Sequence, residues 1–203
     1  MLTLAFDTAT KAATSALVWS SGKGDSEVLG ERVSRAQTLL EDVDALLRQA
    51  GAHPTNLDRL AIGLGPGSFT GVRIGLAVAR GLALSLDLPG AGVSTLDALT
   101  AGAPGAVPVI DAKRREIFTI LDGEPKVLAP QDLPLRDSAL YVGDGALRYR
   151  SLLEERGAEV PPDGDERHLP RARFHAELAR EAGPVDELEP FYLRVPDADR
   201  NVQ

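Results

Sequence analysis

The chain has 203 residues, of which 43% are hydrophobic and 26% charged, so it can bury a core as one domain or as two small lobes. Its formal net charge of −8 argues against a protein that binds nucleic acid on its own, because such binding depends on an excess of Lys and Arg. It contains no cysteine, which excludes disulfides and cysteine-bound zinc, and its apolar runs fall short of a membrane span, so we expect a cytoplasmic protein.

The first half of the chain predicts secondary structure in the order βββαβαβα. Apolar periodicity places strands at 2–7, 14–20 and 27–33, a helix at 35–50, a strand at 57–64, a helix at 69–86, a strand at 88–93 and a short helix capped by Ser94. The helix at 35–50 is amphipathic, and the residues of its apolar face include Leu39, Leu40, Val43 and Leu47.

A glycine-rich turn at residues 65–68 leads directly into the helix at 69–86. The turn lacks the Lys that follows the last glycine of a Walker phosphate loop, which leaves open whether it only caps the helix or also binds an anion or a partner. Small residues recur every four positions in this helix, at Gly71, Gly75, Ala79 and Ala83. Each helical glycine costs about 1 kcal/mol relative to alanine, so the stripe predicts that another backbone comes very close, from this chain or from a second one.

The second half predicts a new unit that begins with strands at 107–111 and 116–121. Its first strand ends in Asp111, as the first strand of the chain ends in Asp7, and a polar turn and a second strand follow each acid. This repetition predicts two related halves, which we place at residues 1–102 and 103–203. Further expected elements are a strand that begins at Leu140, helices at 146–156 and 171–182, and an extended tail at 190–194.

Strand–Asp–turn–strand units in two related halves resemble the actin, sugar-kinase and Hsp70 superfamily, which has an RNase H-like fold. Within it, the sequence resembles the TsaB family, also called YeaZ, of the machinery that installs threonylcarbamoyl on the adenosine beside the tRNA anticodon. The resemblance is carried by Ala5-Phe6-Asp7-Thr8-Ala9-Thr10, residues 65–84 with Val93-Ser94-Thr95-Leu96, Ile110-Asp111-Ala112-Lys113 and Glu189-Pro190-Phe191-Tyr192-Leu193-Arg194.

The resemblance implies an α/β fold of two RNase H-like (actin-like ATPase) lobes, each a mixed sheet flanked by helices. It also implies a non-catalytic scaffold subunit that binds the catalytic paralogue TsaD, with the ATPase TsaE in the same assembly, and that forms a homodimer when alone. The subunit would need no cofactor and would meet tRNA only through the complex. Its partner interface would lie on the helices at 35–50 and 69–86, at Leu39, Leu40, Val43, Leu47, Gly71, Val72, Gly75, Val78, Ala79 and Leu82.

In enzymes of this superfamily the acidic turns hold phosphate and its metal ion. The corresponding positions here are Asp7, Thr8, Thr10 and Asp111, with residues 143–145 as a third wall. The first turn lacks a glycine that would let the backbone approach a phosphate, so we expect a vestigial site at which ATP or ADP binding is possible but not strong. The alternative is a stand-alone nucleotide-binding enzyme of the same fold that works through Asp7 and Asp111.

A hydrolase is disfavoured by the spacing of the candidate catalytic groups. The histidines are His53, His168 and His175, which do not form a metalloprotease motif, and we expect all three at the surface. Ser68 is interpreted as a helix cap rather than a nucleophile, because no base is indicated near it.

Overall fold

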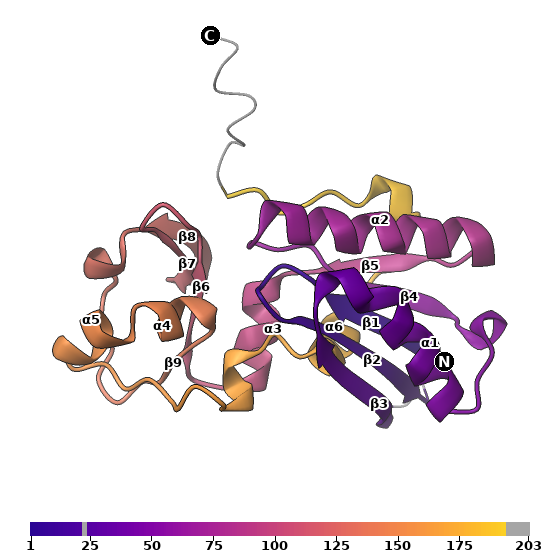
Figure 1. The fold of residues 1–203 in the computed structure, drawn as a ribbon, viewed down its shortest axis with the longest axis horizontal. Helices are drawn as coiled ribbons and strands as arrows, with labels where there is room; N and C mark the ends of the chain where they lie inside the picture. The colour runs from indigo at the N-terminus through magenta and orange to yellow at the C-terminus, as the bar shows by residue number, and fades with distance from the viewer. Residues whose placement is uncertain (22–23, 194–203) are drawn as a thin grey trace, which may run out of the picture.

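Two mixed β-sheets stand side by side in the computed structural model, which describes residues 1–21 and 24–193 (Figure 1). The strand order is β3-β2-β1-β4-β5 in the first sheet and β8-β7-β6-β9 in the second. Strand β1 pairs antiparallel with β2 and parallel with β4, and β6 likewise pairs antiparallel with β7 and parallel with β9. The second sheet thus repeats the topology of the first, which agrees with the two repeated units in the sequence.

The first lobe has the predicted order βββαβαβα. Its strands and helices are β1 (Leu2–Asp7), β2 (Ala13–Ser20), β3 (Ser26–Ser34), α1 (Leu39–Gln49), β4 (Arg59–Gly63), α2 (Phe69–Leu86), β5 (Gly90–Val93) and α3 (Thr95–Gly102). The later elements are β6 (Val107–Asp111), β7 (Ile117–Leu121), β8 (Glu124–Leu128), β9 (Tyr141–Val142), α4 (Asp144–Arg148), α5 (Arg150–Glu155) and α6 (Ala172–Leu178). Short 3₁₀ helices are η1 (Ala36–Thr38), η2 (Pro54–Asn56), η3 (Pro130–Asp132), η4 (Glu166–His168) and η5 (Val185–Glu187).

Two elements of the second lobe differ from the prediction. The sequence pattern does not predict β8, because Pro125 disfavours a strand; the proline is tolerated since β8 lies at the edge of its sheet. The helix predicted at 146–156 begins earlier and is broken at Tyr149, whose backbone (φ −107°, ψ 21°) is not helical.

The two faces of the first sheet are covered by different helices. Large side chains of β1, such as Leu4 and Phe6, pack on one face against α1 and α2. The opposite face is lined by small residues, among them Ala5 and Ala61, and packs against alanines of α6. Small side chains on both sides let this short helix lie close to the strands, so the last helix of the chain covers the first sheet.

Polar contacts also hold α6 on the first sheet. Glu31 of the edge strand β3, whose side chain is only 6% exposed, accepts hydrogen bonds from the guanidinium groups of Arg171 and Arg173. Near the other end of the helix, Arg59 of β4 donates to the carbonyl oxygens of Ala176 and Ala179, which a helix end leaves without helical partners.

Beyond α6 the chain stays on the first lobe. The helix predicted at 171–182 ends at Leu178, because Gly183 then exchanges backbone hydrogen bonds with Gly90 of β5. Phe191 in turn donates its N–H to the carbonyl of Leu64, and Arg194 of the predicted tail lies outside the described residues. The described part of the second half therefore contributes to both lobes, and the division at residues 102 and 103 stays a prediction.

Helix α3 joins the two lobes. Its Leu96 and Leu99 pack against Ile110 and Phe118 on one face of the second sheet, and Leu193 contacts the same cluster. The other face of that sheet is covered by residues of α4 and α5, including Ala146 and Leu153.

Helix α2 has an apolar surface beyond what the sheet needs. Its 18 residues have a mean hydropathy of 1.4, so by length and composition alone the helix could cross a membrane. The short apolar runs in the sequence do not predict this. Core helices of other proteins pass the same test, and here Leu76 and Ala79 pack against the first sheet. Only 28% of the helix is buried, so much of its apolar surface is left uncovered by this chain.

We predict that Glu31→Gln lowers the free energy of unfolding by about 3 kcal/mol, because it removes one partner of a largely buried ion-pair cluster. Burial alone would raise the pKa of Glu31, but hydrogen bonds and charge from Arg171 and Arg173 outweigh burial and lower that pKa below its ordinary 4.5. A carboxyl whose pKa falls on folding stabilises the protein above its unfolded pKa and loses this contribution as the pH falls through the folded pKa. The difference between the proteins, measured by urea unfolding, should shrink as the pH drops below 4.5.

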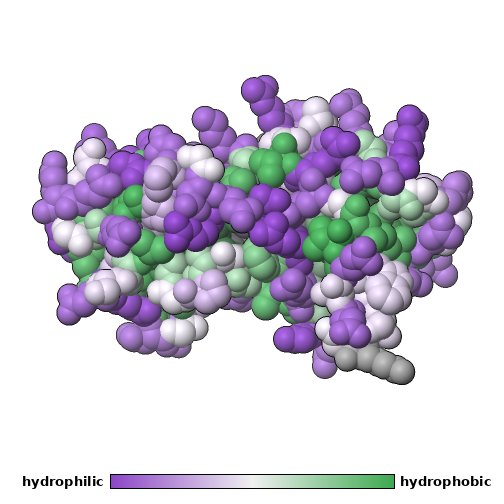
Figure 2. Space-filling model, turned by 90° about the horizontal axis from the view of Figure 1, so that it is seen from below, coloured by the Kyte–Doolittle hydropathy of each residue, from purple (hydrophilic) through white to green (hydrophobic). Residues whose placement is uncertain are grey.

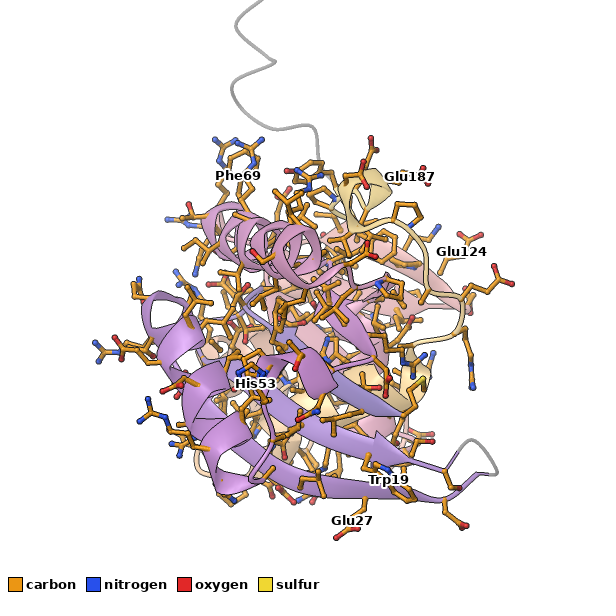
Figure 3. The ribbon with its side chains drawn as sticks, turned by 90° about the vertical axis from the view of Figure 1, so that its right-hand side faces the viewer. Trp19, Glu27, His53, Phe69, Glu124 and Glu187 are labelled. Carbon is orange, nitrogen blue, oxygen red and sulfur yellow. The ribbon has the colours of Figure 1, made fainter. Side chains whose placement is uncertain are left out.

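The matched control is Glu27→Gln, an exposed carboxyl on the same strand (Figure 3). It should change the free energy of unfolding by less than about 0.5 kcal/mol. Equal losses in the two variants, or a Glu31→Gln effect that is independent of pH, would contradict the role given to Glu31.

Candidate functional site

The carboxylate of Asp7 is sealed inside the chain at the end of β1. Its Oδ1 accepts a hydrogen bond from the N–H of Ala9 at 2.6 Å, and its Oδ2 accepts from the hydroxyl of Thr95 at 2.6 Å. The Nε2 atom of His175, on α6, lies 2.8 Å from the same Oδ2, and both side chains are fully buried. Protein groups therefore occupy both oxygens of the first predicted phosphate-site acid.

The local sequence explains how this carboxylate is enclosed. Alternation along β1 puts Asp7 on the same face as Ala5, which is the face that α6 covers. Gly63 at the end of neighbouring β4 leaves room for the carboxylate, because a Cβ at that position would overlap it. Thr95 is brought to it as the first residue of α3, whose N-cap is the predicted Ser94. A buried carboxylate is tolerated when its acceptors are satisfied, as they are here.

The turn after Asp7 lies against the small residues of α2. The Thr8 hydroxyl donates to the carbonyl of Gly71 at 2.7 Å, and a Cβ at either Gly71 or Gly75 would overlap Thr8. The carbonyl of Ala9 accepts from the N–H of Ser68 at 2.6 Å, and the Ser68 hydroxyl caps α2 as predicted. Thr10 donates to the carbonyl of Ala12 at 2.9 Å. The backbone that the small-residue stripe requires is thus this chain's own turn.

Of the two alternatives for the small-residue stripe, these contacts favour a close backbone of this chain, and the partner interface stays a prediction. The predicted interface residues that are buried within the chain are Leu39, Val43, Leu47, Gly71, Val72, Gly75 and Ala79. Leu40 is 57% exposed, and Val78 and Leu82 are partly exposed, so these three remain open to a partner. Thr8 fills the space that the missing side chains of Gly71 and Gly75 leave on α2.

The opposite face of α2 is exposed. Phe69, Arg73, Ala77, Arg80 and Leu84 are spaced by three or four residues and lie on this side, which we call the outer face of α2. Phe69 is 41% exposed and Leu84 is 89% exposed.

The two ends of the outer face differ: side chains contact one another at its start, and a groove lies at its end. At its start, the Arg73 guanidinium lies 3.8 Å from the centre of the Phe69 ring, and Arg73 Nε donates to the Tyr192 hydroxyl at 3.3 Å. At its end, Leu84 borders a groove of about 690 Å³ between α2 and residues 183–186.

Phe69 stands at the opposite end of the first lobe from Trp19 (Figure 3). The underside of the molecule instead shows separate apolar patches divided by polar side chains (Figure 2).

The second predicted acid, Asp111, ends β6 in the second lobe, and its side chain is only 5% exposed. Its Oδ2 pairs with Lys113 Nζ at 2.7 Å and with an Arg148 guanidinium nitrogen at 3.2 Å, and its Oδ1 accepts from the N–H of Lys113 at 2.9 Å. Asp144, in the predicted third wall, accepts from the N–H groups of Asp111 and of Lys11 in the first lobe. Burial raises the pKa of Asp144, and those N–H groups oppose the rise.

Two of the histidines are buried, which corrects the expectation that all three lie at the surface. His175 binds Asp7, while His168 Nδ1 accepts from the N–H of Gly143 at 3.1 Å and His168 Nε2 donates to the carbonyl of Pro161 at 3.0 Å. His53 alone is at the surface, where it caps η2. Within residues 1–21 and 24–193, no three His, Asp or Glu side chains are grouped to hold a metal ion.

The sequence pattern identifies half of this site. It indicates both acids, Ser68 and the close approach to α2. It misses His175, because the pairing of α6 with β1 depends on residues that are far apart in the chain. Thr95 lies in a segment that carries the family resemblance, which is the one signal that could have indicated it.

Comparison with known proteins finds relatives over nearly the whole chain. The family described as tRNA N6-adenosine threonylcarbamoyltransferase, TsaD, matches residues 15–140. The tRNA threonylcarbamoyladenosine biosynthesis protein TsaB of Escherichia coli is 36% identical over 222 aligned positions, covering 96% of this chain and 95% of the relative. TsaB of Bacillus subtilis is 32% identical, covering 77% of this chain and 78% of the relative. The structure of YeaZ from Pseudomonas aeruginosa matches with a TM-score of 0.73 at 28% identity, covering 95% of this chain and 99% of that one.

We predict that Asp7→Asn and His175→Gln each lower the free energy of unfolding by about 3 kcal/mol, because each breaks a fully buried pair. The double variant should be less destabilised than the sum of the two, by about 1–3 kcal/mol, since the second change removes a contact that is already lost. Urea unfolding of the four proteins measures this coupling. The exposed His53→Gln serves as the control and should lose at most about 1 kcal/mol, because it removes only the cap of η2. Strictly additive losses would mean that the two side chains do not interact.

Proposed function

Because the chain belongs to the TsaB family, we propose that it is a non-catalytic subunit that binds and activates the catalytic paralogue TsaD, in an assembly that also contains the ATPase TsaE. The chain takes part in tRNA threonylcarbamoyladenosine biosynthesis, the process for which its relatives are named. In the proposed complex, TsaD transfers threonylcarbamoyl to the adenosine next to the tRNA anticodon, and tRNA meets this cytoplasmic subunit only through the assembly.

The observation that carries the proposal is the outer face of α2. Exposed aromatic and aliphatic side chains on a helix favour a protein partner, and Tyr, Arg and other large side chains supply most of the energy at such interfaces. Phe69, Arg73 and Tyr192 already contact one another, so their side chains lose little freedom on binding. Arg73 and Arg80 on this face argue for a protein rather than the interior of a membrane.

The likeness to the transferase family supports a paralogue as the partner. Residues 15–140 match that family, and they include both α1 and the whole of α2. Two related subunits that present equivalent helices can pair about a pseudo-two-fold axis, as identical subunits do about a true one. The same argument supports a homodimer of this chain when the paralogue is absent.

The internal bonding of the two acids supports a subunit that does not hydrolyse nucleotide. A metal-bound phosphate at Asp7 would have to displace His175 and Thr95, and would leave their polar atoms buried without partners. At Asp111, a metal ion would compete with Lys113 and Arg148 for the same oxygen. Any ATP or ADP binding is expected to be weak, and a stand-alone nucleotide-binding enzyme is the less favoured reading.

We predict that Phe69→Ala combined with Leu84→Asp weakens binding to the co-expressed TsaD paralogue at least about tenfold, because it removes one apolar anchor and places a charge on another. tRNA modification should fall in parallel. Since both side chains are exposed, the free energy of unfolding should change little. Pull-down, a modification assay and urea unfolding measure the three effects.

The control is Trp19→Ala, an exposed aromatic at the other end of the lobe (Figure 3), which should leave binding intact. Undiminished pull-down and tRNA modification in the Phe69→Ala/Leu84→Asp variant would contradict the proposal. Calorimetry with ATP and Mg²⁺ on the isolated chain addresses the alternative: tight binding with turnover that Asp7→Asn abolishes would favour a stand-alone enzyme.

A further inference from the structure

The turn between β6 and β7 is built from residues that its shape disfavours. The N–H of Glu116 donates to the carbonyl of Lys113 at 2.9 Å, which closes a four-residue turn. Arg114 and Arg115, its two central residues, have φ of 52° and 61°, and Lys113 before them has φ of 60°. Two central residues with positive φ form a type I′ hairpin turn, for which Asn-Gly and Asp-Gly are preferred.

The next hairpin of the same sheet has the preferred sequence. Between β7 and β8 the turn residues are Asp122 and Gly123, with φ of 53° and 80°. A side chain beyond Cβ crowds the backbone in this region, so two arginines are poor choices for stability. When a sequence departs from the locally favoured residues in this way, the departure points to a function of the side chains.

The basic side chains of this turn stand in a cationic surface. Lys113, Arg114 and Arg115 are all exposed. Lys113 and Arg148 share one oxygen of Asp111, so that carboxylate balances only one of the two positive charges. The other acids here are Glu116, which ends the turn and, like Arg114, already has an interaction partner, and Asp144, which is mostly covered and whose pKa is raised by burial.

We propose that the Lys113–Arg115 turn binds the phosphate backbone of RNA. Guanidinium groups at the tip of a hairpin can reach successive phosphates of an extended strand, whereas a free nucleotide would need an enclosing pocket. The net charge of −8 opposes RNA binding by the chain as a whole, so the contact is weak outside the assembled complex. The choice of tRNA as the RNA rests on the proposed function.

The test is the double variant Arg114→Asn/Arg115→Gly, which installs the preferred turn sequence while removing two cations. Affinity of the full-length chain for fluorescently labelled, unmodified tRNA is measured by anisotropy over a series of salt concentrations starting near 50 mM. The variant should bind about tenfold more weakly at the lowest salt, and its log–log salt slope should fall by about 1.5, as expected for two lost phosphate contacts. Its melting temperature should rise, since the turn strain is relieved.

The matched control is Arg32→Ala/Arg48→Ala, which removes the same charge from exposed positions on β3 and α1. No detectable binding by the wild-type chain at the lowest salt, unchanged affinity and slope in the turn variant, or an equal loss in the control would overturn the proposal. Pull-down with the TsaD paralogue is run in parallel. Lost pull-down with undiminished RNA affinity would identify the turn as a protein contact and also overturn the proposal. Intact pull-down with undiminished RNA affinity would overturn the RNA site alone and leave the proposed function standing.

Discussion

The hydrogen bonds from His175 and Thr95 to Asp7 connect three parts of the first lobe that are distant in the sequence. They fix α6 against the alanine-lined face of the sheet and α3 at the end of β1. With the carboxylate enclosed, the following turn is pressed onto α2, where Gly71 and Gly75 leave space for Thr8. The glycines of α2, a cost in an isolated helix, therefore serve the packing around one buried acid.

The two lobes have the same topology but differ in how the acid of the first strand is treated. Both acids are buried, but Asp7 is bonded to neutral or histidine side chains, while Asp111 is paired with the exposed cations Lys113 and Arg148. In the second lobe the turn after the acid carries exposed cations in a backbone region that costs L-residues roughly 1–2 kcal/mol each. The acid of the first unit thus bonds only to groups inside the lobe, while the acid of the second unit pairs with exposed cations.

The sequence pattern predicts the features that depend on residues close together in the chain. Period and capping signals predicted β1, β6 and α2 with the bounds that the structure has, as well as the caps at Ser68 and Ser94. The repeated strand–Asp–turn–strand unit predicted the matching sheet topologies. Burial of His175 was not predictable, because it depends on α6 returning across the whole chain to β1. The stripe on α2 indicated a close backbone correctly, and only the structure could decide that this backbone belongs to the same chain.

The most direct test of this account is nuclear magnetic resonance of the His175 ring in protein with ¹⁵N-labelled histidine. If Asp7 is sealed by this imidazole, the proton on Nε2 should exchange slowly with water, and its signal should stay in place when ATP and Mg²⁺ are added in excess. A proton that exchanges at the rate of an exposed histidine, or a signal that shifts as nucleotide binds, would contradict the sealed carboxylate and the subunit role that follows from it.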